Sequence, residues 1–132
     1  MPNGFHGPDD AWRRMEAPLL GLDPVLERFA RDQGLAIRRN HHNWPERSLI
    51  WGEPIRRLIQ IYLEDEETLT WNLWLCASED RGSSRYWKNA FLLRAAPIED
   101  LERTLPDLLE EARRRVDSWS SDQLEFAAKL GT

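Results

Sequence analysis

Residues 59–75, IQIYLEDEETLTWNLWL, contain two runs in which large apolar side chains fall on every second position. The first run covers 59–63 and the second covers 69–75. A period of two places alternate side chains on opposite faces of a strand, so each run predicts a β-strand with one apolar face. The acidic connection at 65–67 is short enough for a hairpin, which predicts that the two strands are antiparallel.

The same alternation extends the predicted sheet on both sides of this hairpin. Strands are expected at 35–39, 48–51, 55–64, 68–77 and 85–94. A polar turn is expected at 40–47, and the other connections are also short. Short connections favour pairing between consecutive strands, so we expect an antiparallel meander.

Helical patterns flank this sheet in the sequence. A short helix is expected over 9–16, where Pro18 would end it, and a second helix over 24–33, ended by Gly34 in a left-handed conformation. From Pro97 onward an apolar stripe with steps of three and four residues predicts a long C-terminal helix.

Two features shape the C-terminal helical region. Pro106 is expected to kink the helix or to divide it near Thr104. Ser120 with Gln123 resembles a capping box that would open a final helix. The whole pattern predicts a two-layer α+β sandwich: an antiparallel meander of about five strands with the N-terminal and C-terminal helices packed on one face. Residues 1–8 are expected to form a flexible arm and 9–132 a single domain.

Pairing the strands about the 65–67 turn divides their side chains between two faces. The apolar set predicts the face covered by helices and comprises Ile59, Ile61, Leu63, Leu69, Trp71, Leu73, Leu75, Trp87, Phe91 and Leu93. The second set predicts a mixed face and comprises Leu58, Gln60, Tyr62, Thr70, Asn72, Trp74, Cys76, Lys88 and Leu92. A mixed face is typical of an antiparallel sheet that is partly open to water.

The bulk composition excludes several classes of protein. The chain has 132 residues and a net charge of −5, so sequence-independent binding of nucleic acid is not expected. Its one cysteine, Cys76, cannot form an internal disulfide and is expected to be a buried apolar residue. With no secretory signal and no apolar run long enough to span a membrane, a cytoplasmic protein is expected.

No catalytic, metal or cofactor motif is present in the sequence. His41 and His42 are the first candidates for metal binding, with Glu46 nearby, but adjacent histidines in extended chain point apart and the His-Glu-x-x-His spacing is missing. We expect a non-enzymatic protein with no cofactor and no metal.

The seven tryptophans are the strongest functional indication, because aromatic rings beside amide groups make good anchors for a partner. The candidate binding residues are Gln60, Tyr62, Asn72, Trp74, Lys88, His41, His42 and Trp44. The leading hypothesis is a module that binds a protein partner, or itself as a homodimer, through the mixed face or an open strand edge. The alternative is a small-molecule pocket between sheet and helices, in which His41 or His42 would act as a base.

Overall fold

The computed structural model describes residues 6–41, 44–52, 55–79 and 86–119. The elements along the chain are α1 (His6–Gln33), β1 (Ala36–His41), β2 (Trp44–Trp51), β3 (Ile55–Asp65), β4 (Thr70–Glu79), β5 (Tyr86–Pro97) and α2 (Ile98–Asp117). The final helix expected from Ser120 lies outside the described residues.

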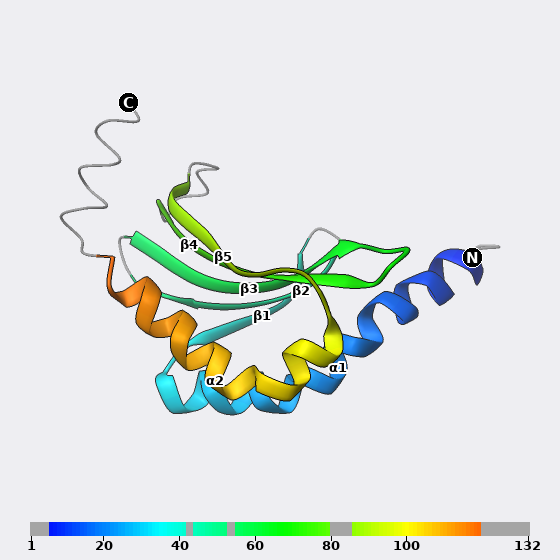
Figure 1. Cartoon of the computed structure of the whole chain (residues 1–132), viewed down its shortest axis with the longest axis horizontal. Helices are drawn as coiled ribbons and strands as arrows, with labels where there is room; N and C mark the ends of the chain where they lie inside the picture. The colour runs from blue at the N-terminus through cyan, green and yellow to red at the C-terminus, as the bar shows by residue number, and fades with distance from the viewer. Residues whose placement is uncertain (1–5, 42–43, 53–54, 80–85, 120–132) are drawn as a thin grey trace.

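The five strands form one antiparallel sheet in the order β1-β2-β3-β4-β5. Both helices lie on the same side of this sheet, and the first turns of α1 extend past it (Figure 1). The prediction of a two-layer α+β sandwich built on a five-stranded meander is confirmed. We call the side of the sheet turned away from α1 and α2 the open face.

The core lies between the sheet and the helices. The alternating residues Trp71, Leu73 and Leu75 of β4 are 0% exposed, as the period of two predicts. The helix side of the core is formed by buried residues at steps of three and four, namely Leu19, Leu22 and Leu26 of α1 and Leu101, Leu105, Leu109, Ala112 and Val116 of α2. Burial of these two apolar stripes fixes which face of the sheet is covered.

The N-terminal region differs from the sequence prediction, because α1 is one continuous helix that contains both Pro18 and Pro24. It also begins at His6, inside the segment expected to be an arm. The stripe of buried residues runs on through both prolines, so packing against the sheet outweighs the local cost of a missing helical hydrogen bond. Gly34 ends the helix with φ +69°, as predicted.

The first hairpin also differs from the prediction. Residues 44–47, expected to be part of a turn, are the beginning of β2, which pairs with β1 and β3. Arg47 faces the helices within this strand and is 1% exposed. A buried arginine breaks the alternation of apolar and polar residues, and this explains why the strand was predicted too short.

The pairing of β4 with β5 reverses three predicted positions, and one of them is Leu92 of the predicted mixed face, which packs against the core. Trp74 lies opposite Phe91, so Phe91 belongs to the open face and not to the core, and Lys88 lies opposite Ala77 on the side of the helices. The register shifts between Ala77 and Ser78 and again between Leu73 and Trp74. Each shift adds one residue to β5, so the part of β5 between the two shifts, which contains Lys88 and Phe91, has its faces exchanged.

The C-terminal helix α2 is kinked at Thr104, where φ is −127° and ψ is 16°, two residues before Pro106. This confirms the predicted interruption, although the Thr104 hydroxyl donates to the Asp100 carbonyl at 3.0 Å and caps no second helix. No helix within the described residues is both long enough and apolar enough to cross a bilayer.

Candidate binding face

A single row of side chains crosses all five strands on the open face. The residues are paired directly across neighbouring strands, in the order Arg38, Ser48, Gln60, Trp74 and Phe91. We call this the middle row. With neighbouring strands about 4.8 Å apart, the row is about 19 Å long. Its β1 end is charged, its centre is polar and its β5 end is aromatic.

The charged end is organised by Glu46, which lies beside the row on β2 and is only 2% exposed. The Arg38 guanidinium donates from Nε to Glu46 Oε1 at 3.0 Å and from Nη2 to Oε2 at 3.3 Å. Ser48 Oγ and Gln60 Nε2 also donate to Oε2, at 2.5 and 2.6 Å. One buried carboxylate therefore fixes three of the five side chains in the middle row.

This network compensates for the burial of a charge. A carboxylate removed from water is destabilising unless it is paired and hydrogen-bonded, and Glu46 has both an ion pair and additional donors. Arg38 keeps 30% of its side chain exposed, and its Nη1 makes no hydrogen bond to a described residue. The open face thus presents a guanidinium that is held in place by Glu46 and whose Nη1 N–H groups can still donate hydrogen bonds.

The aromatic end of the row consists of Trp74 and Phe91. Trp74 is partly exposed, and its indole Nε1 donates to Asn89 Oδ1 at 3.3 Å. Phe91 is 37% exposed, and the Arg94 guanidinium carbon lies 4.7 Å from its ring centroid. Arg94 also lies 3.7 Å from a carboxylate oxygen of Glu64. Two rings on neighbouring strands, with the Arg94 guanidinium over Phe91, form an apolar patch with a charged border.

Gln60, Tyr62 and Asn72 lie on the open face as predicted, but they are not equally accessible. Gln60 and Tyr62 are partly exposed, whereas Asn72 is 0% exposed. The Asn72 amide donates to Glu64 Oε2 at 2.9 Å, and its carbonyl oxygen accepts from the Ala95 backbone N–H at 2.8 Å. Ala95 has φ +52°, so Asn72 holds a bulge of β5 in place and is not available to a partner.

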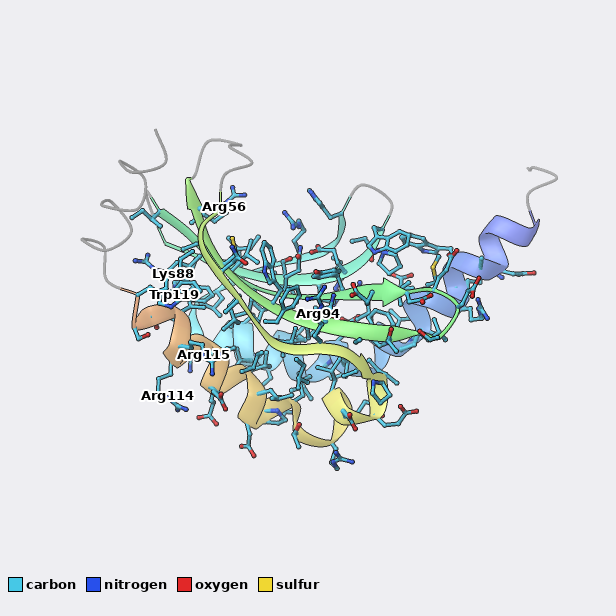
Figure 2. All side chains as sticks on the ribbon, turned by 45° about the horizontal axis from the view of Figure 1, so that its top comes forward. Arg56, Lys88, Arg94, Arg114, Arg115 and Trp119 are labelled. Atoms are coloured by element: carbon cyan, nitrogen blue, oxygen red, sulfur yellow. The ribbon has the colours of Figure 1, made fainter. Side chains whose placement is uncertain are left out.

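Three predicted site residues in the described part of the chain, Lys88, Trp44 and His41, lie away from the middle row. Lys88 lies beside Trp119 on the side of the helices, at the end of the molecule that also carries Arg114 and Arg115 (Figure 2). Its Nζ is 5.4 Å from the Trp119 ring centroid. Trp44 is 41% exposed at the start of β2, where its Nε1 donates to the Leu63 carbonyl at 3.2 Å.

The two histidines do not form a site in the described part of the chain. His41 is exposed at the end of β1, opposite Trp44, and His42 lies outside the described residues. Among the described residues, no three histidine, cysteine or acidic side chains gather closely enough to hold a metal ion.

Cys76 lies on the open face but is 0% exposed, between Leu58 of β3 and Asn89 of β5. Burial raises the pKa of its thiol from 9.0 to about 12, and a hydrogen bond with Ser78 lowers it by a smaller amount. A thiol that stays protonated is a poor nucleophile, so Cys76 is a packing residue.

The raised pKa of Cys76 predicts a stability change at alkaline pH. Below pH 9 both states keep the proton, and between pH 9 and about 12 only the unfolded thiol ionises, so the free energy of unfolding is expected to fall across this range. Comparing wild-type and Cys76→Ala denaturation curves over this pH range isolates the thiol from other titrating groups. Parallel pH profiles would contradict the expectation.

Sequence reasoning missed four important residues of this face, namely Arg38, Glu46, Ser48 and Phe91. Arg38 and Arg39 lie on opposite faces of β1, since Arg38 pairs with Glu46 on the open face and Arg39 with Glu27 of α1. The pairing of Arg38 with Ser48 and Glu46 would have followed from a correct start of β2.

Comparisons with protein-family models, with curated proteins and with solved structures find no match for this chain.

Proposed function

We propose that this chain is a non-enzymatic module that binds a protein partner through the middle row of its open face. The observation that carries the proposal is that four of the five residues in the middle row, Arg38, Gln60, Trp74 and Phe91, are at least partly exposed on a sheet face that no described helix covers. Tryptophan, tyrosine and arginine are the residues that contribute most at protein interfaces, and Tyr62 lies directly beside this row.

The face is a better candidate than the two strand edges. The β1 edge is six residues long, and Asn40 breaks it with φ +66° at a bulge. The β5 edge belongs to a pair with three register shifts. Short strands and bulges discourage pairing with a further strand, because they bend the hydrogen-bonding groups out of line. The polar centre of the row supplies donors and acceptors that a flat apolar dimer face lacks.

A small-molecule site between sheet and helices has no comparable support. The side chains that line this space, such as Leu73 and Leu105, are fully buried against one another, and His41 is exposed away from them. A cytoplasmic location also belongs to the proposal; it is supported only by the single buried cysteine.

Trp74→Ala is expected to remove binding through this face. Random 12-residue peptides displayed on phage would be selected on the wild-type protein, and the dissociation constants of synthetic copies measured by calorimetry. Truncation of a central aromatic anchor is expected to weaken the selected peptides by about 30-fold or more. Sedimentation equilibrium of the protein alone would show whether a second copy occupies the same face, in which case Trp74→Ala abolishes the dimer.

The matched control is Trp51→Ala, because Trp51 is also partly exposed but belongs to the opposite side of the sheet, where its indole donates to Asp117 at 3.1 Å. Circular dichroism verifies that both variants fold. Selected peptides that bind wild-type and Trp74→Ala protein equally, together with no dimer that depends on Trp74, would reject the proposal.

A further inference from the structure

We propose that the partner presents an extended acidic segment to the open face, with one carboxylate on Arg38 and one large apolar side chain on the Trp74–Phe91 patch. This inference rests on the proposed function and specifies the chemistry of the partner. It follows from the unused atoms of Arg38, from the balance of charge on the face, and from the spacing of the middle row.

The first argument is the geometry of Arg38. Glu46 takes the Nε and Nη2 edge of the guanidinium, and Ser48 Oγ lies 3.3 Å from Nη2. These bonds orient the planar group while leaving the two N–H groups of Nη1 without a described acceptor. A guanidinium fixed by a buried carboxylate loses little side-chain entropy on binding, which favours a carboxylate of the partner as its next acceptor.

The second argument is the sign of the charge on this face. The chain carries a net charge of −5, yet the described open face holds Arg38, Arg56 and Arg94 against the carboxylates of Glu46 and Glu64. Glu46 is bound by Arg38, and Glu64 is bound by Asn72 and paired with Arg94. Figure 2 shows Arg56 toward the end of the sheet near Lys88, and Arg94 farther along β5. Three guanidinium groups on one face of a chain with a net charge of −5 favour an acidic segment as the partner.

The third argument is the length of the middle row. Three strand spacings separate Arg38 from Trp74, which is about 14 Å at about 4.8 Å each. An extended chain advances about 3.3 Å per residue, so a segment lying along the row covers this distance in about four residues. The acidic and the apolar side chain are therefore expected about four or five positions apart in the partner.

The peptides selected on the wild-type protein test this chemistry directly. The expected result is enrichment of sequences with Asp or Glu four or five positions from an aromatic or large aliphatic residue. Replacing that acid with its amide is expected to weaken binding to the wild-type protein by about 10-fold or more, as loss of a charged hydrogen bond does. This measurement needs no change in the protein, so it is independent of how variants fold.

Arg38→Gln completes a double-mutant cycle with the same peptides. The acid and its amide are expected to bind Arg38→Gln protein equally, and raising the salt concentration should weaken the acidic peptide much more on wild-type protein than on this variant. Arg28→Gln is the control, because Arg28 is exposed on α1, away from the open face. If Arg38→Gln destabilises the protein by leaving Glu46 unpaired, Arg38→Lys can be used in its place. Lysine keeps a positive charge, so this variant is expected to retain part of the preference for the acidic peptide over its amide.

The outcomes separate this inference from the proposed function. Peptides that depend on Trp74 but show no preference for acid, or whose acid acts equally on wild-type and Arg38→Gln protein, overturn the inference and leave the binding face standing. If the selected peptides bind wild-type and Trp74→Ala protein equally, and no dimer depends on Trp74, both the inference and the proposed function are rejected.

Discussion

Replacing Arg47 with methionine is expected to lower the free energy of unfolding by about 3–5 kcal/mol, because it leaves the buried Asp23 carboxylate without its partner. The Arg47 guanidinium makes five hydrogen bonds, one for each of its N–H groups. It donates to both carboxylate oxygens of Asp23, from Nε at 2.7 Å and from Nη2 at 3.2 Å, and Nη2 also donates to Glu16 at 3.4 Å. Asp23 and Glu16 belong to α1, so the Arg47 side chain links this helix to β2.

The loss should be seen in urea denaturation followed by circular dichroism. The control is Arg115→Met, which removes an exposed pair with Glu111 at 3.4 Å and is expected to change stability by about 0.5 kcal/mol or less. In Arg47→Met with Asp23→Leu, no charged Asp23 remains unpaired, so we expect the double variant to be more stable than Arg47→Met alone. An Arg47→Met protein within 1 kcal/mol of wild type would show that water or a rearranged side chain replaces the guanidinium.

The faces of β3 and β4 could be predicted because their side chains alternate without interruption. Leu73 and Trp74 occupy the predicted sides, and the pairing of β3 with β4 places Ile59 opposite Leu75 and Ile61 opposite Leu73. The connection between the two strands lies at 66–69 and not at 65–67 as predicted, and the bulge between Leu63 and Asp65 adds the one residue that keeps both apolar sets on the same face.

The site was predicted only in part, for the same physical reason. Residues whose faces follow from alternation, such as Gln60, Tyr62 and Trp74, were found on the open face. Phe91 and Lys88 exchanged faces because they lie between two register shifts of the β4–β5 pair, whose positions no turn signal in the sequence reveals. A buried ionic group is equally hard to predict, since Arg47 resembles a turn residue until its partners on α1 are known.

Replacing Trp71 with alanine is expected to lower the free energy of unfolding by about 3–5 kcal/mol, through lost apolar burial and the cavity that remains. Trp71 is 0% exposed on the helix side of β4, where it lies opposite Leu63 and Ala96. Its indole Nε1 is buried and has no hydrogen-bond acceptor among the described residues. The ring therefore stabilises the core by filling volume, while its buried and unpaired N–H group destabilises the folded state.

Trp71→Phe separates these two contributions, because phenylalanine keeps most of the aromatic volume and removes the unpaired donor. We expect it to cost about 1.5 kcal/mol or less, far below the alanine variant. Urea denaturation followed by far-ultraviolet circular dichroism gives both values without relying on tryptophan fluorescence. If phenylalanine proves as damaging as alanine, the indole N–H must have an acceptor in solution, and Trp71 would then position a polar group as well as fill the core.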